Sequence, residues 1–430
     1  MSFLFLSYYY PPLQSIAAIR LWQWSKNLQK NNYKTIVLTT SNRHLLAKEN
    51  CDISQIEIHE LPTFDYRTLV AWLRPQRSTL HFEEGIKKNK LIYCYVRLKN
   101  TIPFNFFLDE GSILYIAIGI LKAIKIVKKQ KITHVISSYR PYSDHFIAFC
   151  LKKIFKNKIH WTADFRDLHV DPLYHHYYWH RLQCWANRFI LKNADLVTTV
   201  SYGLAKHLKP FNSNIYVLRN SIEPLEILPS ENHSETFNLV YTGSMFGDER
   251  DPQLLLAVLV EMIAENTVFK KTIRFKYAGK DMHIWHQYLE KYTSIIPIFE
   301  YKGTISRTQS RALQAEAHIN VLLTTATPEI GGILTGKFNE YLQMRQPIIV
   351  LINGVKDEEF EQIVVETNCG IVVYNTQWDA DKVVLKQFLN HYFDIWKNTG
   401  TIAPIVPLQA LQSWTWQAQI TRFLDLIKTK

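Results

Sequence analysis

The sequence predicts an α/β protein made of two Rossmann-like domains, each built on a parallel sheet. At 430 residues, the chain is too long for a single ordinary hydrophobic core. Short runs of strand-forming residues alternate with helical patterns of roughly 10–15 residues, which is typical of βαβ units. This alternation stops at the polar stretch 229–236 and then starts again, so a linker joins two separate sheets.

The first half begins with an apolar, strand-like run that ends at Pro11 and Pro12. An irregular stretch from about 42 to 110 interrupts the alternation and is interpreted as an insertion. The predicted strands are 3–9, 35–39, 134–137, 159–163, 196–200 and 215–218. The predicted helices are 16–28, 113–130, 144–155 and 179–192.

The second half repeats the pattern, with a helix at 253–265 after its first strand. Its predicted strands are 238–241, 273–277, 319–323, 348–351 and 370–373. We therefore expect an N-terminal domain of residues 1–222 and a C-terminal domain of residues 223–404. Residues 405–430 should form a last helix that packs back on the N-terminal domain.

Charge is divided unequally between the halves. Residues 1–220 hold 31 basic and 14 acidic side chains, a net +17, whereas residues 221–430 carry a net −5. A basic half suits phosphate, nucleic acid or an anionic membrane surface, and composition does not choose among them. No nucleic-acid-binding module is recognisable, so we expect no nucleic-acid partner.

The cysteines and apolar segments indicate the compartment. Five widely spaced cysteines without a C-x-x-C pair argue against a disulfide framework or zinc cluster and for a reducing environment. The start of the chain lacks the cationic segment of a signal peptide. The longest apolar run, 113–121, is too short to cross a bilayer. We expect a cytoplasmic protein, soluble or peripheral at the inner face of the membrane.

Ligands of open parallel sheets bind at the carboxyl ends of strands, and two such places fall in the first half. After the first strand come Tyr10 and, on the next helix, Arg20, where unpaired helix amides favour an anion. After residues 159–163 come Asp164, Arg166 and Asp167, which suit sugar hydroxyls or a proton transfer. The structural alternatives are a strand ended by prolines with a solvated Arg20, and a salt-bridged loop capped by Asp167.

A third strand end carries Gly243 and Ser244, followed by Arg250. A Gly-Ser turn exposes backbone amides to a phosphate, and the arginine would neutralise its charge. Many strand ends have such a turn, so a purely structural role is the alternative.

The fourth and most informative stretch spans residues 329–341 and begins with a glycine-rich loop. Glycines allow the backbone to approach a pyrophosphate closely, and the following helix would aim its positive end at it. Lys337 adds a full charge, and Glu340 lies one turn later, where it would accept ribose hydrogen bonds. The alternative is a loop and an amphipathic helix with an exposed Lys–Glu pair. The loop residues are Gly331, Gly332, Ile333 and Leu334.

Five segments, in this order, resemble bacterial glycosyltransferases of the GT-B fold, specifically the group-1 or family-4-type retaining enzymes. The segments are YYYPP, ADFRD, NADLVTTVS, YTGS and GGILTGKFNEYLQMRQPIIV. The resemblance implies two Rossmann-like domains facing across a cleft. It also implies acceptor binding in the first domain, nucleotide-sugar binding in the second, and no metal or other cofactor.

Individual positions depart from this family pattern. Glu340 matches the second glutamate of the E-x7-E element, which holds the donor ribose, but the first glutamate is replaced by Gly332. The N-G-x-D turn at the hinge appears as residues 220–223, Asn-Ser-Ile-Glu. These departures bear on the donor sugar more than on the fold.

The resemblance implies hexosyl transfer with retention from a nucleotide sugar to a glycan or lipid-linked acceptor. The pathway would be cell-surface polysaccharide or lipopolysaccharide synthesis, with peripheral contact to anionic membrane. A nucleotide-sugar epimerase and a non-catalytic sugar-binding relative remain alternatives. The expected catalytic residues are Asp164, Asp167 and Lys337. The expected donor-binding residues are Gly243, Ser244, Arg250, Gly331, Gly332, Ile333, Leu334, Lys337 and Glu340, and the expected acceptor-binding residues are Tyr10, Arg20 and Arg166.

One motif has the spacing of a metal site but is not interpreted as one. Asp379 and Asp381 have D-x-D spacing, but they fall at the start of a predicted helix, where aspartates cap amides.

Overall fold

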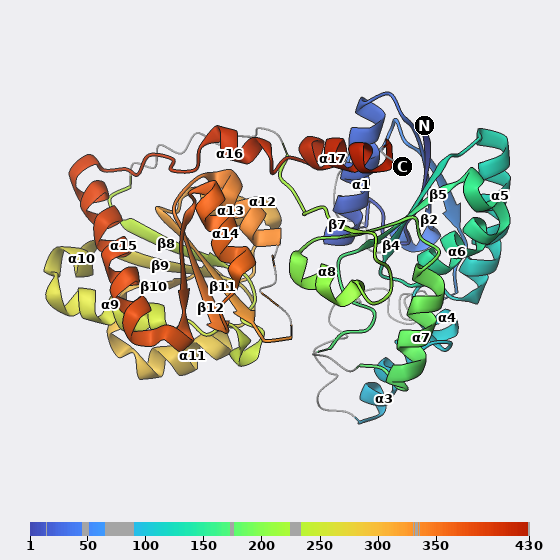
Figure 1. The fold of residues 1–430 in the computed structure, drawn as a ribbon. Coiled ribbons are helices and arrows are strands. Elements are labelled where there is room, and N and C mark those ends of the chain that lie inside the picture. Colours follow the sequence, from blue (N-terminus) through green and yellow to red (C-terminus); the bar gives the residue numbers. More distant parts are fainter. Residues whose placement is uncertain are drawn as a thin grey trace. The chain divides into compact units, whose positions relative to one another are not determined.

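The computed structural model describes residues 1–13, 15–44, 51–64, 90–172, 176–223, 234–329, 331, 334 and 336–428. The chain divides into two compact units, Met1–Asn220 with Gln419–Lys430, and Ser221–Ala418 (Figure 1). The division lies two residues before the boundary expected from the sequence. Residues 405–418 belong to the second unit, so only the end of the expected C-terminal segment joins the first.

The first unit contains a seven-stranded parallel sheet in the order β3-β2-β1-β4-β5-β6-β7. These strands are β1 (Ser2–Leu6), β2 (Lys34–Thr40), β3 (Glu57–Leu61), β4 (His134–Tyr139), β5 (His160–Phe165), β6 (Leu196–Thr199) and β7 (Ile215–Val217). The interpretation of residues 42–110 as an irregular insertion is wrong in part. This stretch contributes strand β3 and the helices α3 (Lys90–Lys99) and α4 (Asn105–Leu108).

Helices cover both faces of this sheet. They are α1 (Ile16–Lys30), α5 (Ile113–Gln130), α6 (Ser143–Phe155), α7 (His180–Leu191) and α8 (Tyr202–Leu208). The crossovers through α5, α6 and α7 all step in one direction across the sheet, whereas the crossover through α1 steps in the other. Because such crossovers are right-handed, α5, α6 and α7 share one face and α1 covers the opposite one.

The last helix, α17 (Trp416–Lys428), packs beside α1. Its Phe423 ring lies 5.1 Å from Trp24 and 6.4 Å from Phe3, measured between ring centroids. The sequence pattern predicted one continuous helix here. The structure has a separate α16 (Leu408–Gln412) before it, because Trp414 turns into the second unit's core and Thr415 pairs with Ile222.

The second unit contains a six-stranded parallel sheet in the order β10-β9-β8-β11-β12-β13. Its strands are β8 (Phe237–Thr242), β9 (Ile273–Ala278), β10 (Phe299–Tyr301), β11 (Ile319–Ala326), β12 (Ile348–Gly354) and β13 (Gly370–Tyr374). Its helices are α9 (Gln253–Glu265), α10 (Thr267–Thr272), α11 (Met282–Lys291), α12 (Arg307–Ala315), α13 (Gly336–Met344), α14 (Glu358–Thr367) and α15 (Trp378–Thr399), with α16.

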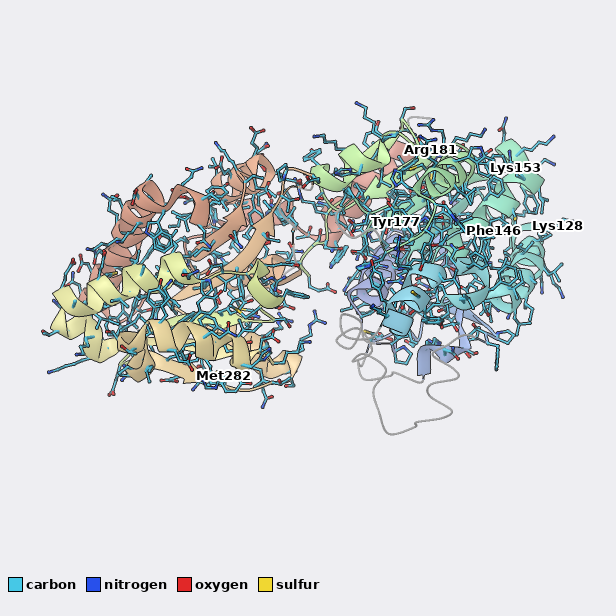
Figure 2. The ribbon with its side chains drawn as sticks, turned by 90° about the horizontal axis from the view of Figure 1, so that it is seen from below. Lys128, Phe146, Lys153, Tyr177, Arg181 and Met282 are labelled. Atoms are coloured by element: carbon cyan, nitrogen blue, oxygen red, sulfur yellow. The ribbon has the colours of Figure 1, made fainter. Side chains whose placement is uncertain are left out.

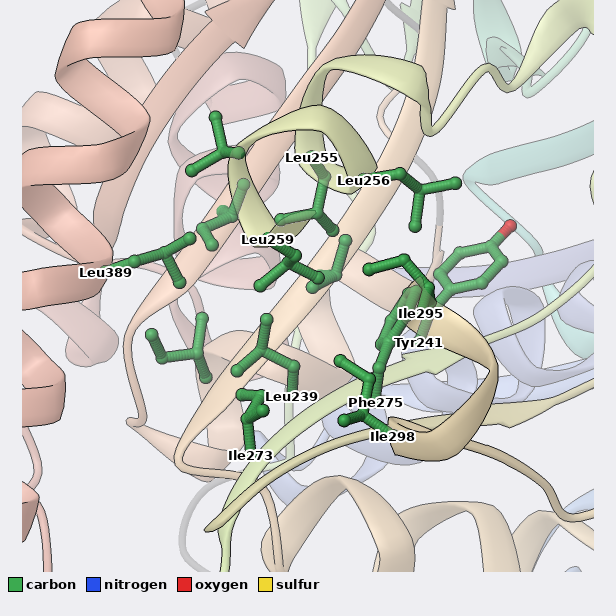
Figure 3. Packing of buried hydrophobic residues seen from close by; sticks show 14 of the residues in the cluster. Leu239, Tyr241, Leu255, Leu256, Leu259, Ile273, Phe275, Ile295, Ile298 and Leu389 are labelled. Carbon is green, nitrogen blue, oxygen red and sulfur yellow. The ribbon is translucent and has the colours of Figure 1, made fainter. Parts of the chain in front are cut away.

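Alternate residues of the second sheet enter cores on its two faces. Leu239 and Tyr241 pack with α9 on one face (Figure 3). Ile348 and Val350 pack with α13 and α14 on the other face. Burial on both faces explains why these strands are nearly continuous apolar runs. The predicted pair of parallel-sheet α/β domains is therefore confirmed. No helix in the described ranges combines the length and hydropathy needed to cross a membrane.

Candidate donor and acceptor sites

Strand order reverses between β1 and β4 in the first sheet and between β8 and β11 in the second. At such a reversal the connections leave in opposite directions, and the carboxyl ends of the two strands leave room for a ligand. The residues that follow β8 and β11 are those that the sequence marked for donor binding. The residues that follow β1 and β4 lie at the equivalent position in the first sheet, at its own strand-order reversal.

Lys337 and Gly243 meet at the reversal in the second sheet. Gly243 follows β8 with φ +140°, a conformation that side chains rarely adopt. A Cβ built on Gly243 would lie 1.4 Å from Lys337 Nζ and 2.6 Å from its Cε. A glycine is therefore required here, because the space beside the strand end is filled by the lysine's aminoalkyl chain.

The ammonium group of Lys337 is held in an unfavourable setting for a charge. Burial, with the Arg250 guanidinium as the next contribution, lowers its pKa to about 8. Its Nζ lies 6.0 Å from the centre of the Tyr241 ring. Within the described part of the chain, no carboxylate lies at ion-pair distance from this nitrogen. Glu340 and Asp281 offset this in part, and an anionic ligand beside Lys337 would favour the charged amine further.

Glu340 lies one turn along α13 and is held by two neighbours from α12. Gln314 Nε2 donates to its Oε2 at 3.2 Å, and Arg307 Nε lies 3.6 Å from its Oε1. Gln314 Nε2 also donates to Thr242 Oγ1 at 2.9 Å, which ties Glu340 to the end of β8. The Tyr341 hydroxyl lies 3.1 Å from both the amide nitrogen and Oγ1 of Thr242. This network fixes the register of α13 against β8, so Lys337 and Glu340 are presented together.

Ser244 and Arg250 form the next part of the same edge. The Ser244 carbonyl accepts hydrogen bonds from the Tyr241 hydroxyl and from Arg250 Nη1, each at 2.7 Å. The Arg250 guanidinium also lies over the Phe246 ring, 4.3 Å from its centre. Asp281 accepts from the Met245 amide at 2.7 Å and anchors the far side of the turn. The turn after β8 is thus fixed by the side chains of Tyr241, Arg250 and Asp281.

The glycine-rich stretch is described only at some positions. Gly331 lies near the Asp357 carboxylate, with its ideal Cβ 3.8 Å from Oδ1, and Leu334 packs on the core beside α13. Gly332 and Ile333, both expected to bind donor, lie outside the described residues. The helix itself begins at Gly336, next to Lys337, so its positive end lies at the same edge.

In the first unit, Arg20 and Asp164 form an ion pair in which both side chains are inaccessible to solvent. Arg20 Nη2 and Nε donate to the two carboxylate oxygens at 2.8 and 3.0 Å. Asp164 also accepts from Thr198 Oγ1 at 2.8 Å. Burial alone would raise the pKa of Asp164, but Arg20 and Thr198 together hold it below the usual range. Arg20 is therefore not the solvated side chain of the alternative interpretation.

The remaining bonds of Arg20 explain its position. Its guanidinium also donates to the Leu218 carbonyl at 2.9 Å and to Asn220 Oδ1 at 3.2 Å. The pair therefore joins α1, β5 and the last residues of the first unit. Tyr10 is likewise internal, because its hydroxyl is buried 2.7 Å from Ser25 Oγ on α1.

Arg166 and Asp167 lie nearer the surface than Asp164. Asp167 is exposed and Arg166 is half-buried, with Nη2 donating to the Tyr139 carbonyl at 2.6 Å. Arg166 thus reaches from the end of β5 to the end of β4. Of the three residues in this predicted loop, these two are the ones placed to contact a ligand.

Sequence reasoning missed a second charged group at this edge, contributed by the stretch after α4. Tyr9 donates a hydrogen bond to Glu110 Oε2. The buried Asp109 carboxylate lies 3.6 Å from Lys99 Nζ and 3.8 Å from Arg140 Nε. The Asp109-Glu110 pair before a helix start was the available signal, but its stretch gave no periodic pattern to place it on the sheet.

Asp144, at the start of α6, is a further buried carboxyl that the sequence did not mark. It accepts from the Tyr8 amide at 2.8 Å and from the Tyr115 hydroxyl at 2.7 Å. Burial raises the pKa of Asp144 to about 7. The ends of β1, α5 and α6 are therefore tied together by a group that titrates near neutrality.

Among the described residues, no cluster of three histidine, cysteine or acidic side chains could hold a metal ion. Asp379 and Asp381 lie in the first turn of α15, and Asp381 accepts from the Tyr374 amide at 2.6 Å. That bond holds the preceding strand end against the helix.

Comparison with known proteins identifies the architecture. Neither a protein-family model nor a curated protein sequence matches the chain. Among solved structures, a glycosyltransferase from Rickettsia africae superimposes with a TM-score of 0.57 at 12% identity, covering 100% of this chain and 98% of that one. An α,α-trehalose-phosphate synthase (UDP-forming) from Burkholderia xenovorans gives a TM-score of 0.56 at 11% identity, with 99% of each chain covered.

The lipopolysaccharide outer core galactosyltransferase WaaB also matches, with a TM-score of 0.56 at 12% identity, covering 100% of this chain and 99% of that one. Likeness at this identity shows a common fold over the whole length of the chain. The chain has the GT-B fold, as the resemblance of its motifs predicted.

Proposed function

We propose that this chain, which has the GT-B fold, is a glycosyltransferase that uses a nucleoside-diphosphate sugar as donor. Its second unit binds the donor and its first unit binds the acceptor hydroxyl. The observation that carries the proposal is Lys337, whose ammonium is packed on Gly243 at the strand-order reversal of the second sheet. A half-buried cation without a carboxylate at ion-pair distance among the described residues suits a diphosphate.

The departure of the nucleoside diphosphate places negative charge on its β-phosphate as the bond to the sugar breaks. Lys337 and the amino-terminal end of α13 would stabilise that charge, and Arg250 would act from the opposite side of the turn. Removing one such preorganised group from an enzyme typically costs about 10²–10³ in turnover. Gly331, Gly332, Ile333 and Leu334 would provide backbone contacts to the diphosphate, with Gly243 and Ser244 on the facing strand end.

Glu340 would accept hydrogen bonds from the donor ribose. Its carboxylate is half-buried, and Gln314 and Arg307 hold it in place. A fixed carboxylate one helical turn from the phosphate-binding lysine suits two vicinal hydroxyls. Gly332 replaces the glutamate that the family pattern puts at the donor sugar, so we assign no side-chain contact to the sugar ring.

The acceptor would bind at the carboxyl edge of the first sheet. We propose that Asp167 and Arg166 contact it directly, because they lie at or near the surface beside β4 and β5. Arg20 and Asp164 would hold the end of β5 in place without contacting the acceptor, since their hydrogen bonds are made within the protein. Tyr10 would likewise support the strand end from the core.

We further propose that transfer retains the anomeric configuration and needs no metal ion or other cofactor. The acceptor is assigned to glycans or lipid-linked glycans of cell-surface polysaccharide or lipopolysaccharide synthesis. Support comes from the motif resemblance and from the net charge of +17 in residues 1–220, which favours anionic acceptors at a membrane. The protein would work in the cytoplasm, with peripheral contact to the membrane.

The donor site is tested by a side chain at position 243 that would displace Lys337. Thermal unfolding is measured with UDP-, GDP- and ADP-sugars, and a saturating donor should stabilise the wild type by up to several kcal/mol. Gly243→Val should abolish that stabilisation. Gly303→Ala is the matched control, because Gly303 also has positive φ (+76°) but faces open space. Unchanged donor binding by Gly243→Val would refute the proposed site.

Product analysis separates the alternatives. A glycosyltransferase releases nucleoside diphosphate in proportion to acceptor, whereas an epimerase interconverts donors without releasing it. A binding relative would be stabilised by donor and yield neither product. The anomeric signal of the product in an NMR spectrum tests retention, and activity in the presence of EDTA tests metal independence.

A further inference from the structure

Helix α7 presents large apolar side chains to solvent on its outer face. Trp185 is 63% exposed, and Leu182 and Phe189 lie on the same stripe because they are one turn away in each direction. Trp179, just before the helix, is 58% exposed. A helix of a folded domain normally turns such residues toward the core. An exposed apolar stripe of this kind therefore marks an interaction surface.

The exposed stripe continues onto α6 as a run of aromatic contacts. The Trp185 and Phe189 rings stack with centroids 5.5 Å apart, and Phe189 lies 5.6 Å from Phe149 of α6. Phe149 lies 6.1 Å from Phe146, which lies 4.8 Å from Phe106 of α4. The exposed Trp185 ring is therefore packed at the end of a continuous series of aromatic contacts that reaches α4.

Helix α5 adds further apolar exposure on the same side of the sheet. Leu121 is 70% exposed, and Ile113 and Leu114 are exposed at the start of the helix. Helix α6 contacts both α5 and α7, so the three form one layer. We call the solvent side of this layer the α5–α7 face.

The charges of this face are of one sign. All residues of α5, α6 and α7 are described, and their one acidic residue is the buried Asp144. The three helices contain four, two and two basic residues, respectively, including Lys128, Lys153 and Arg181 (Figure 2). Lys122 donates to the backbone carbonyl of Glu60, and Lys152 pairs with the Asp195 carboxylate. The other six basic side chains are exposed.

We propose that the α5–α7 face docks on the surface of a bilayer containing anionic phospholipid. Trp185, Phe189 and Leu182 would enter the interface between headgroups and acyl chains, while the lysines and arginines lie against lipid phosphates. A basic, tryptophan-bearing helix face with no exposed carboxylate fits such a surface. A protein partner would need its own acidic, apolar patch, whereas an anionic bilayer offers both features everywhere. The inference rests on the peripheral membrane contact of the proposed function and deepens it, since it assigns that contact to the residues of one surface.

The experiment measures binding of the full chain to vesicles by sedimentation. Vesicles of phosphatidylcholine alone are compared with vesicles that also hold about 30 mol% phosphatidylglycerol. The wild type should bind the anionic vesicles, and raising NaCl from about 50 to 500 mM should weaken binding because exposed charges are screened. Trp185→Ala/Phe189→Ala and Arg181→Glu/Arg188→Glu should each reduce binding at least about tenfold.

Matched controls lie on helices of the second unit. Val383→Ala/Val384→Ala removes two exposed apolar side chains from α15, and Lys270→Glu/Lys271→Glu reverses two exposed charges on α10. Both should bind vesicles as the wild type does. Quenching of tryptophan fluorescence by brominated lipid should fall sharply in Trp185→Phe, which reports insertion of that one side chain.

Three outcomes would overturn the proposal. One is failure of the wild type to bind anionic vesicles, and another is equal binding by the α7 variants. The third is a wild-type dimer that the Trp185→Ala/Phe189→Ala variant loses without any vesicle binding, which would make the face a protein interface. Vesicle binding is measured without donor or acceptor. Gly243→Val, which should lose the donor, is expected to bind vesicles normally, so this proposal and the proposed function can fail separately.

Discussion

Arg20 in the first unit and Lys337 in the second differ in how the surrounding protein balances their charge. Arg20 in the first unit is fully buried and bonded to Asp164, Leu218 and Asn220. Lys337 in the second unit is packed on a glycine, and its pKa is lowered to about 8. The first cation has its counter-charge within the fold. For the second, no described carboxylate lies at ion-pair distance.

This difference distinguishes a structural charge from one kept for a ligand. A buried ion pair with satisfied hydrogen bonds fixes one arrangement of the elements that it joins, here α1 and β5. A half-buried amine with a lowered pKa is in a setting that disfavours its charge, and a bound anion would relieve this. Each basic residue lies in the helix that follows a strand, Arg20 in α1 and Lys337 in α13, so that placement alone does not tell a structural charge from a ligand-binding one.

The largest effect that tests this comparison is on stability. Asp164→Ala leaves the Arg20 guanidinium buried without its counter-charge, which should lower the free energy of unfolding by about 3–5 kcal/mol. The urea midpoint measures the loss. Replacing both charges in Arg20→Met/Asp164→Leu should restore much of the stability. The exposed Asp167→Ala is the control and should unfold within about 0.5 kcal/mol of the wild type. An unchanged midpoint in Asp164→Ala would show that the pair does not hold the first unit together.

Lys337→Met should have the opposite effect to Asp164→Ala, with a loss of turnover and no loss of stability. Turnover with the preferred nucleotide sugar should fall about 10²–10³-fold, because the departing diphosphate loses a preorganised cation. The thermal midpoint should hold or rise, because a half-buried amine is replaced by a thioether of similar length. Lys356→Met is the control, since that lysine is exposed and paired with Glu361. A variant that unfolds early but retains turnover would reverse the roles assigned to the two cations.

A third test uses the buried Asp144 of the first unit, whose pKa is raised to about 7 from an ordinary value of 3.8. The folded state therefore holds a proton that the unfolded chain releases, so stability is full below about pH 4 and falls as pH rises to about 7. The loss should reach a few kcal/mol at most. Asp144→Asn stays neutral and should flatten this part of the stability profile, measured as urea midpoints at pH 5 and 8. Parallel profiles for the two proteins would contradict the buried, protonated carboxyl.

The smallest effect sharpens the description of Lys337. Because its pKa is lowered to about 8 in the unliganded protein, kcat/KM for the donor should fall about tenfold per pH unit above that value. The profile of kcat should break at higher pH, since a bound diphosphate favours the charged amine. Lys337→Arg, which stays charged, should remove the break at pH 8 at some cost in rate. A break that persists in this variant would belong to another group.

Predictability differed among the elements for physical reasons. Helices 113–130 and 253–265 were predicted with the bounds that the structure shows, because their apolar residues recur with helical spacing. Strand β3 and helix α3 were missed, since β3 alternates polar residues at the sheet edge and is only partly buried. The last helix was predicted as one, because a sequence pattern does not show that Trp414 belongs to a different core from Phe423.

The candidate site was predictable where chemistry depends on local order along the chain. Gly243, Lys337 and Glu340 stood out because glycine, lysine and glutamate follow strand ends at fixed offsets. Gln314 and Arg307, which hold Glu340, were missed because they come from a different helix. Asp164 was predicted to face a ligand, and nothing in its local sequence reveals that Arg20, 144 positions earlier, neutralises it.

The sequence by itself determined the two parallel sheets, the strand ends that carry polar residues, and the uneven charge of the halves. These properties follow from the periodicity and composition of short segments, which act through local conformation and burial. Tertiary structure alone decided which charges are neutralised within the fold and which have no carboxylate at ion-pair distance among the described residues. It also decided that α5, α6 and α7 form one basic face with exposed tryptophan. The reason is that an ion pair or a surface depends on distances between segments far apart in the chain, which local patterns do not specify.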